Sequence, residues 1–238
     1  MESVTKKEIL LSKRMQMVAN MVTKGNVLAD IGCDHGFVSI YLIEQGICKK
    51  VIAMDVNEGP LLRAKEHIEE KGLTEYIDIR LSDGMEKLLL KEADSILIAG
   101  MGGRLVIKIL SDYMEKSRAL KEIILQPQSE LHLVREFLIN NGFHILKEDM
   151  VEENGKYYPS IKTAWKEDAQ GMLAEHELWY GPCLLSDRHP VLLEYLNREK
   201  NKFEQITKEI ECSSKDEESA NRAVEERITL IDKALACF

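Results

Sequence analysis

Short apolar runs alternate with amphipathic helical stretches between residues 27 and 141, and this alternation limits the folds that the chain can adopt. Each apolar run, at 27–31, 50–54, 77–81, 95–99 and 122–125, precedes a helical pattern, at 37–45, 60–71, 84–90, 103–116 and 129–141. Strands that alternate with helices in this way form a parallel sheet with helices on both faces. The sequence therefore predicts the α/β class, with a Rossmann-like, doubly wound sheet.

Two longer apolar runs, 143–151 and 157–165, follow these repeats and flank the turn-like segment 152–155. Runs joined by a short turn containing Asn-Gly pair in the antiparallel sense. We expect them to close one edge of the sheet, which then has seven strands and is mostly parallel.

Helical patterns precede and follow this α/β region. Residues 8–23 carry Leu11, Met15, Val18 and Val22 at helical spacing, and Gly25 is placed to end that helix in the left-handed conformation. Beyond about residue 170 the strand pattern stops. Two segments separated by the polar stretch 212–219 have apolar a/d positions: Leu192, Leu196, Phe203, Ile206 and Ile210, then Val224, Ile228, Ile231, Leu235 and Phe238.

These heptads predict an antiparallel coiled-coil hairpin, which would be marginally stable alone and should rest on the core domain or on a partner. We therefore divide the chain into an α/β domain with its N-terminal helix, 1–170, and a helical hairpin, 171–238. The heptads would serve an intramolecular hairpin or a partner interface, and we expect a monomer.

Composition excludes several classes of protein. The net charge is −9, from 32 Lys and Arg against 41 Asp and Glu, so any contact with nucleic acid must be local. Its apolar runs are too short to span a membrane, and the N-terminus lacks a signal-like stretch, so we expect a soluble cytoplasmic protein. Five cysteines without CxxC spacing predict reduced thiols and no metal site: Cys33, Cys48, Cys183, Cys212 and Cys237.

The segment after the first strand, Asp30-Ile31-Gly32-Cys33-Asp34-His35-Gly36, opens directly into a helix. Glycines there allow a tight turn and let a ligand lie against the main chain at the helix N-terminus, as in nucleotide-binding clefts. The dinucleotide motif would need glycine where the chain has Asp34 and Phe37. Asp30 instead suits a ligand with a cationic amino acid end.

Acidic residues also end the second and third strands. Asp55 lies nineteen residues after Gly36, close to the spacing at which a carboxylate meets ribose hydroxyls. Asp83, before Gly84, is placed to accept from an adenine amine. Each acid alone is explained equally well as a strand end or helix cap, but Asp30, Asp55 and Asp83 together favour a nucleoside site.

The fourth strand ends in Ala99-Gly100-Met101-Gly102-Gly103, where a flexible loop would line a slot for a flat base. A glycine turn with a helix cap would account for two of these glycines. The Asn/Asp-Pro-Pro-aromatic motif of enzymes that methylate exocyclic amines is absent.

Together these motifs resemble the bacterial tRNA (adenine(22)-N(1))-methyltransferases. The resemblance spans about residues 11–183 and rests on the segments 11–14, 29–32, 34–35, 83–84, 98–103 and 125–127. Cys33, where such enzymes often have a small residue, and Asp55, where Glu also occurs, are mild departures.

The resemblance implies a class I methyltransferase fold and methyl transfer from S-adenosyl-L-methionine to N1 of an adenine in tRNA. It implies that the cofactor is bound by Asp30, Gly32, Cys33, His35, Gly36, Asp55, Val56, Ser82, Asp83, Gly84, Ala99 and Gly100. Asp34, Met101 and Gly102 are the expected catalytic residues. Lys13, Arg14, Gly103, Gln126 and Pro127 are the expected contacts to tRNA.

Several of these roles have structural alternatives. We expect Asp34 to accept from the adenine N6 amine, against a plain helix cap. His35 is either a packing residue or a contact to the ligand. Lys13 and Arg14 are either phosphate contacts or part of a solvated face, and the tryptophans, Trp165 and Trp179, are expected in the core and at the hairpin.

Two other functions remain open from the sequence. One keeps the cofactor but methylates a small molecule or a protein, which the acidic composition favours. The other is a non-catalytic nucleotide-binding or coiled-coil module, in which the hairpin is the active part.

Overall fold

A seven-stranded mixed sheet forms the centre of the molecule. The computed structural model describes residues 9–168, 171–212 and 218–238. The strands lie in the order β3-β2-β1-β4-β5-β7-β6. Their bounds are β1 Val27–Ile31, β2 Lys50–Asp55, β3 Ile77–Leu81, β4 Ser95–Ala99, β5 Glu122–Gln126, β6 Phe143–Glu153 and β7 Lys156–Trp165.

The first five strands pair in parallel, and β7 pairs antiparallel with both β5 and β6. Asn154 and Gly155, at φ 54° and 76°, make the tight turn between β6 and β7. Left-handed conformations at both positions match the twist of a hairpin. The predicted Rossmann-like sheet with an antiparallel edge is therefore confirmed.

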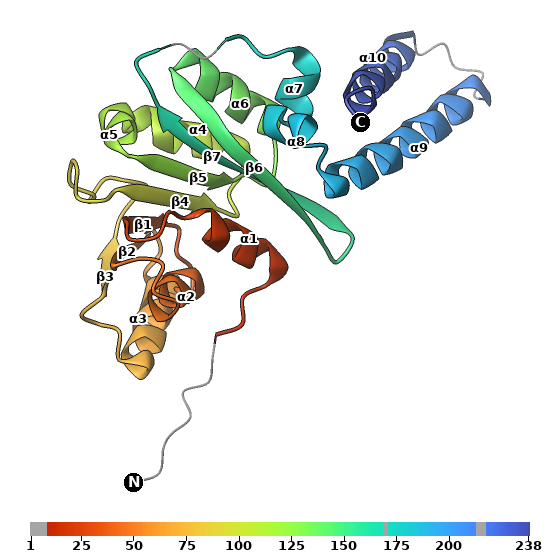
Figure 1. Cartoon of the computed structure of the whole chain (residues 1–238). Coiled ribbons are helices and arrows are strands. Elements are labelled where there is room, and N and C mark those ends of the chain that lie inside the picture. The colour runs from red at the N-terminus through yellow and green to blue at the C-terminus, as the bar shows by residue number, and fades with distance from the viewer. Residues whose placement is uncertain (1–8, 169–170, 213–217) are drawn as a thin grey trace.

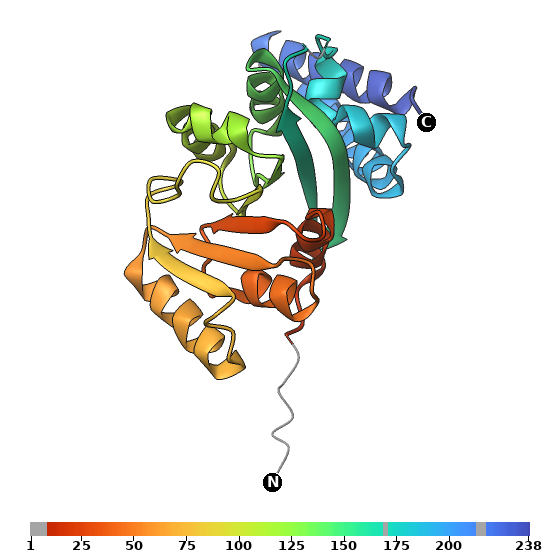
Figure 2. The same ribbon diagram turned by 60° about the vertical axis from the view of Figure 1, so that its left-hand side comes forward.

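Helices cover both faces of the sheet (Figures 1 and 2). On one face, α1 Lys13–Met21, α2 Phe37–Glu44 and α3 Glu58–Lys71 bury residues such as Val18, Ile40 and Ile68. On the other, α4 Gly103–Asp112, α5 Met114–Ala119 and α6 Leu131–Asn140 pack around Val106, Leu110 and Leu138. The strands buried on both sides, such as β4, are therefore mostly apolar, whereas the half-buried edge strand β3 carries Asp78 and Arg80.

Three local predictions were wrong. The helix expected at 84–90 is a series of turns, because the Ser82 hydroxyl donates to the Gly84 carbonyl and accepts from the Lys87 N–H, which replaces the first helical turn. The helix expected at 103–116 breaks at Tyr113, into α4 and α5.

The third wrong prediction concerns the first helix, which ends at Met21, so Gly25 does not cap it. Gly25 is left-handed, and its N–H donates to Ile47. The helix also begins later than predicted, at Lys13 with Ser12 as its N-cap, so residues 9–12 precede it; residue 8 lies outside the described residues.

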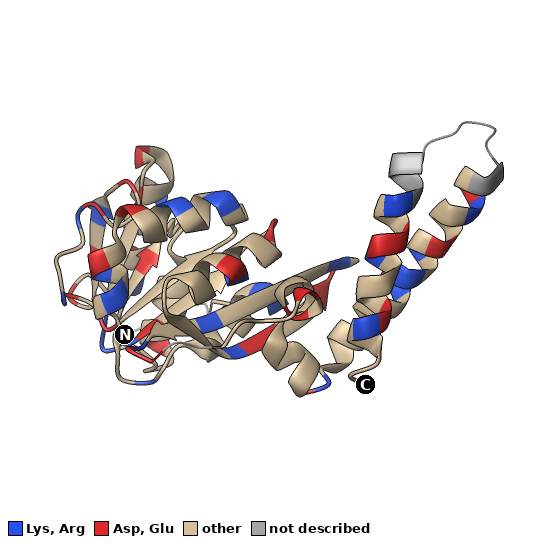
Figure 3. Cartoon of the chain, turned by 90° about the horizontal axis from the view of Figure 1, so that it is seen from above, with Lys and Arg blue, Asp and Glu red and all other residues tan. Residues whose placement is uncertain are grey.

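Four helices follow the sheet: α7 Glu175–Tyr180, α8 Pro182–Ser186, α9 Pro190–Cys212 and α10 Glu218–Leu235. The long helices α9 and α10 lie side by side and project beyond the sheet (Figures 1 and 3). Among their predicted a/d residues, Leu192, Leu196 and Ile231 are buried. Those farther from the sheet, such as Ile206 and Val224, are half-buried. Most of the polar stretch predicted between the helices, residues 213–217, lies outside the described part.

A buried ion pair joins these helices to the sheet. The Arg135 Nε on α6 lies 2.8 Å from Glu148 Oε1 on β6, with side chains 1% and 0% exposed. Arg135 also donates to the carbonyls of Leu178 and Trp179, and Glu148 accepts from the N–H of Cys183. Each of the two buried charges is therefore paired with the other and has further hydrogen bonds, as a charge removed from water requires.

Trp179 strengthens the same junction. Its ring stacks on His132 of α6 at 3.9 Å between centroids, and the Arg227 guanidinium of α10 lies 4.0 Å from the ring centroid. Trp165 packs half-buried against the sheet core. Both tryptophans therefore have the packing roles predicted for them.

Candidate functional site

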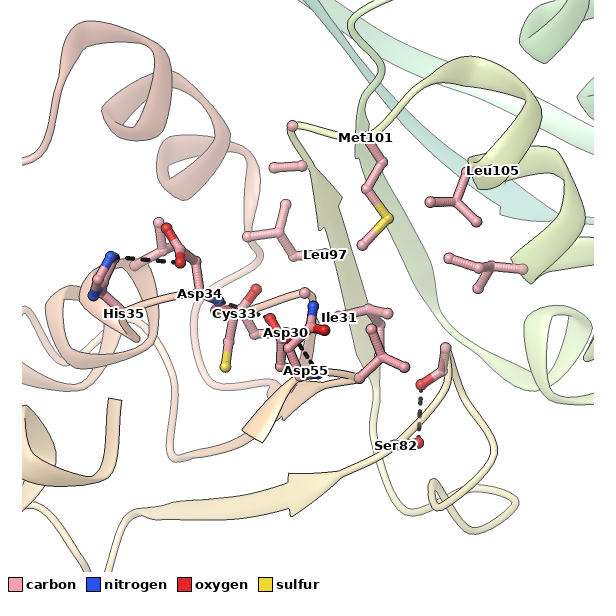
Figure 4. Close-up of a pocket in the computed structure, with 18 of the residues that line it drawn as sticks. Asp30, Ile31, Cys33, Asp34, His35, Asp55, Ser82, Leu97, Met101 and Leu105 are labelled. Atoms are coloured by element: carbon pink, nitrogen blue, oxygen red, sulfur yellow. Dashed lines mark hydrogen bonds and ion pairs between the residues drawn. The ribbon is translucent and has the colours of Figure 1, made fainter. Parts of the chain in front are cut away.

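A cavity of about 540 Å³ opens at the carboxyl ends of the parallel strands. Its walls come from the turns after β1, β2, β3 and β4, from α1, and from Gln128 after β5. The strand order reverses between β1 and β4, and ligands of doubly wound sheets bind at such a switch point. Figure 4 shows the acidic residues on one side of this cavity, facing Met101 and Leu105 on the other.

The turn after β1 is built from left-handed residues. Gly32, Asp34 and Gly36 have φ of 76°, 50° and 72°. A Cβ on Gly32 would overlap the end of the Met101 side chain, so this glycine leaves space across the cavity. Gly36 lies outside the cavity wall, since it is the N-cap of α2 and its missing Cβ would lie 3.1 Å from Ala64 on α3.

Asp30 is a buried acid at the floor of the site. Its Oδ2 accepts from the Ser39 hydroxyl at 2.6 Å. Burial raises the pKa of Asp30 to about 6, the Ser39 hydrogen bond opposes that rise, and the nearby Asp55 charge adds to it. A cation placed here would therefore meet a carboxylate that has no positive partner of its own in the described structure.

The neighbouring Cys33 is also buried, and burial raises the pKa of its thiol. A protonated thiol is a poor nucleophile. Cys33 therefore contributes shape to the cavity.

Asp55 ends β2 and links two of the turns around the cavity. Its carboxylate accepts from the N–H of Asp34 at 3.3 Å and from that of Asn57 at 2.9 Å. A carboxylate has lone pairs for about four hydrogen bonds, so capacity remains for ligand hydroxyls. Asp83, exposed after β3, lines the same cavity with Ser82 and Gly84.

Asp34, like Asp83, is an exposed acid of the site. Its side chain is 70% exposed and lies 3.5 Å from His35 Nε2. The helix-cap alternative fails, because Gly36 is the N-cap of α2, which begins at Phe37, and no side chain caps this helix. A non-glycine residue held at φ 50° costs free energy, and such strain gathers at functional sites.

His35 lines the cavity, and its ring stacks on Phe37 at 5.7 Å between centroids, so both of the roles predicted for it stay open. Its carbonyl oxygen lies 3.0 Å from His67 Nδ1.

The loop after β4 forms the opposite wall with Gly100 and Met101. Gly100 is left-handed, and a Cβ there would lie 3.6 Å from Gln128 Nε2 and 3.9 Å from Arg14 Nη1. Arg14 and Gln128 therefore stand beside the loop, at the mouth of the cavity.

Six predicted site residues lie outside the wall of this cavity. Besides Gly36, they are Lys13, Gly102, Gly103, Gln126 and Pro127. Gly102 is the N-cap of α4, and a Cβ on Gly103 would overlap the Ser129 carbonyl, so Gly103 serves packing. Gln126 is fully buried at the end of β5.

Pro127 lines the adjoining cavity, whereas Lys13 is exposed and its N–H donates to Glu153. In the described ranges, no three His, Cys, Asp or Glu side chains are placed to hold a metal ion.

The other predicted site residues line the cavity, together with several that the sequence analysis missed. Those missed are chiefly apolar: Met15, Phe37, Val38, Leu97, Leu105 and Ile109, with Asn57 and Gln128. Phe37 begins α2 and Leu105 lies in the first turn of α4, each shortly after a glycine turn, and this position explains why these apolar side chains are exposed. For Phe37 and Leu105, the sequence signal was their position in the first helical turn after a predicted binding loop.

Comparisons with known proteins agree with this geometry. A family model described as a methyltransferase domain matches residues 11–161. The tRNA (adenine(22)-N(1))-methyltransferase of Bacillus subtilis is 32% identical over 233 residues, 96% of this chain and 98% of the relative.

Solved structures are similar over the same length. The B. subtilis m1A22 tRNA methyltransferase TrmK superposes with a TM-score of 0.83 at 30% identity, covering 96% of this chain and 100% of that one. Mycoplasma capricolum TrmK, in complex with the cofactor product S-adenosyl-homocysteine, has a TM-score of 0.82 at 26% identity, covering 95% and 98%.

Proposed function

The chain belongs to the tRNA (adenine(22)-N(1))-methyltransferase family, and we propose that it transfers a methyl group from S-adenosyl-L-methionine to N1 of adenine 22 in tRNA. The observation that carries this proposal is one cavity at the switch point of the sheet. It gathers Asp30, Asp55 and Asp83 on one side and the Gly100–Met101 loop on the other. This pairs a nucleoside site with a slot for a flat acceptor.

The cofactor site fits a sulfonium nucleoside. Asp30 is the buried carboxylate suited to the ammonium of the amino acid end, Asp55 to the ribose hydroxyls, and Asp83 to the adenine amine. The cavity volume of about 540 Å³ lies within the range of pockets that hold ligands of this size. When bound, this cofactor supplies an electrophilic methyl group.

The acceptor nitrogen needs no strong base. N1 of a neutral adenine already has a lone pair, so the protein has to extrude the base, align N1 and exclude water. Met101 and Leu105 form the apolar wall that excludes water (Figure 4). The bare main chain at Gly100 leaves room for the face of the base.

We assign Asp34 to the acceptor amine. Its exposed carboxylate accepts from the adenine N6 hydrogen, which increases electron density at N1 and offsets the positive charge that develops on methylation. Arg14 holds the phosphate next to that base at the cavity mouth, and Lys13 holds a phosphate farther out.

We propose that residues 1–170 form the catalytic domain and that the helices of residues 171–238 form a coiled-coil hairpin that contacts the RNA. The half-buried a/d residues of α9 and α10 support that packing. None of the helices in the described ranges combines the length and apolar character of a bilayer span. We propose a cytoplasmic monomer.

The test is nuclease digestion and mass spectrometry of tRNA after incubation with the protein and methyl-labelled cofactor. We expect one label for each tRNA molecule, as 1-methyladenosine at position 22. A transcript with guanosine at that position is the matched control and should stay unlabelled. Label in protein or small molecules, with none in tRNA, contradicts the proposal.

A further inference from the structure

A second cavity of about 540 Å³ lies on the same edge of the sheet as the catalytic one. It is bounded by the turn after β5, the start of β7 and one side of α9. Because β7 runs antiparallel, its first residues lie at the edge where the parallel strands end. Gln128 lines both cavities, so they adjoin. We call this second cavity the tyrosine groove, defined by Gln128, Leu131, Tyr157, Tyr195, Arg198 and Lys202.

Aromatic rings form one wall of the tyrosine groove. The rings of Tyr157 and Tyr195 lie 5.1 Å apart at 57°, and the Arg198 guanidinium lies 5.7 Å from the Tyr157 ring centroid. Hydrogen bonds hold these groups in place: Tyr157 donates to Glu194 at 2.7 Å, and Arg198 donates to the Gly155 carbonyl at 3.0 Å. Aromatic rings held in fixed positions can stack on a flat base without first losing side-chain freedom.

Cations surround these rings in a chain that is acidic overall. Three exposed cations line the groove: Lys156 from the β6–β7 hairpin, and Arg198 and Lys202 from α9. Glu199 is the acid among the lining residues. Glu199 is paired at 3.9 Å with Arg227. Figure 3 shows the tip of the β6–β7 hairpin, which carries both basic and acidic residues, next to α9. The local excess of positive charge favours an anionic ligand.

The groove deepens into an inner cavity of about 190 Å³ that shares Gln128, Tyr157 and Tyr195 with it. Tyr180 lines this inner cavity with its side chain 2% exposed. The phenol oxygen of Tyr180 has no hydrogen-bond partner among the described residues. A buried hydroxyl of this kind is stabilised by a polar edge brought in by a ligand.

We propose that the tyrosine groove binds the nucleotide that flanks the target adenine in tRNA, an inference that rests on the proposed function. The flanking base stacks on Tyr157 and Tyr195 with its polar edge toward Tyr180. Its phosphate pairs with Arg198 and Lys202. Arg14 lies over the ring of Tyr158, a groove residue, at 5.2 Å and also lines the catalytic cavity, so a cation stands between the two cavities.

This site gives the enzyme a means of extruding its base. Flipping a nucleotide breaks its stacking on both neighbours, which costs free energy. A neighbour that stacks on protein rings instead recovers part of that loss. Stacking tolerates any base, so the tyrosine groove selects an unpaired strand and not a sequence.

The first test compares Tyr157→Ala with Tyr157→Phe. We expect Tyr157→Ala to raise the KM for tRNA about ten- to a hundredfold while the affinity for the cofactor stays unchanged. Tyr157→Phe keeps the ring and should retain nearly full tRNA affinity. Equal effects of the two variants, or no effect of Tyr157→Ala in a protein that methylates tRNA, overturn the proposal.

A second pair of variants tests the phosphate contact without touching the apolar packing. Lys202 and Lys208 are exposed lysines on the same helix, separated by about 9 Å of helix length. Lys202→Ala should weaken tRNA binding and lower its salt dependence, by about 0.7 in the log–log slope. Lys208→Ala should do neither, and equal losses from both would show a diffuse charge effect and refute the groove.

Abasic nucleotides in the tRNA connect the groove to one base. A tRNA lacking the base on one side of the target adenine should lose affinity for the wild-type protein, and Tyr157→Ala should lose little more on that tRNA. If the affinity loss from Tyr157→Ala multiplies with the loss from the missing base, whichever side of the target adenine lacks its base, the assignment is refuted. If the wild-type protein methylates no tRNA at all, the proposed function fails instead, so the two failures are distinguishable.

Discussion

Replacing Asp30 with asparagine tests whether this carboxylate is kept for ligand binding at the expense of stability. The substitution keeps the shape of the side chain and an oxygen to accept from the Ser39 hydroxyl, which lies 2.6 Å from Oδ2. It removes only the charge. Because Asp30 is buried, ionising it in the free protein costs free energy, and the neutral amide of the variant would avoid that cost.

The size of the effect follows from the pKa. Burial raises the pKa of Asp30 from 3.8 to about 6, and at about 1.36 kcal/mol for each unit of pH this is about 3 kcal/mol. Between these two values the folded protein holds a proton that the unfolded chain has lost. The free energy of unfolding therefore falls as the pH rises from about 4 to about 6, and the loss is complete above that.

Urea unfolding between pH 4 and pH 8 measures this. We expect the difference in unfolding free energy between Asp30→Asn and wild type to grow by about 3 kcal/mol, in favour of the variant, between pH 4 and pH 6. Ser39→Ala is the matched control, since loss of its hydrogen bond should raise the folded-state pKa of Asp30 further and extend the upper end of this pH window.

Cofactor affinity should change in the opposite direction. A charge-assisted hydrogen bond contributes about 1.5–3 kcal/mol to binding. Titration calorimetry with S-adenosyl-homocysteine at pH 7.5 should therefore show a Kd for Asp30→Asn that is about ten- to a hundredfold higher than that of wild type. A variant whose stability keeps the wild-type dependence on pH, or whose Kd is unchanged, would refute this role for Asp30.

Three further predictions follow from the structure. Asp34→Ala should lower kcat at least about a hundredfold with cofactor affinity and Tm intact; a lower Tm with normal turnover would indicate a structural role. Arg14→Glu should weaken tRNA binding and its salt dependence more than Lys13→Glu, because only Arg14 lines the cavity; equal effects in filter binding would contradict this. Arg135→Ala leaves the Glu148 carboxylate buried without its cation and should cost about 3–5 kcal/mol in urea unfolding; a loss below about 1 kcal/mol would show that the pair is not needed.

The sheet was predictable because strand and helix patterns are local. Each of the seven strands was placed to within about two residues, since apolar runs between glycine turns have few alternatives. The failure at 84–90 came from one hydroxyl, that of Ser82, which satisfies main-chain groups that a helix would otherwise pair. Competition of this kind depends on side-chain geometry that periodicity does not describe.

The candidate site was predictable in part for a similar reason. Carboxyl ends of parallel strands meet at one edge, so Asp30, Asp55 and Asp83 were expected together and lie together. Spacing could not separate glycines that face a ligand, such as Gly32, from those such as Gly103 that admit a neighbouring main chain. That difference depends on which segment packs opposite.

By itself the sequence determined the order of strands and helices, the acids at the strand ends and the family of the protein, because each depends on residues close together in the chain. Only the tertiary structure decided the burial that raises the pKa of Asp30, the Arg135–Glu148 junction and the tyrosine groove. These join residues far apart in the chain, such as Tyr157 and Tyr195. Their free energies depend on desolvation and on mutual distance, which exist only after the chain has folded.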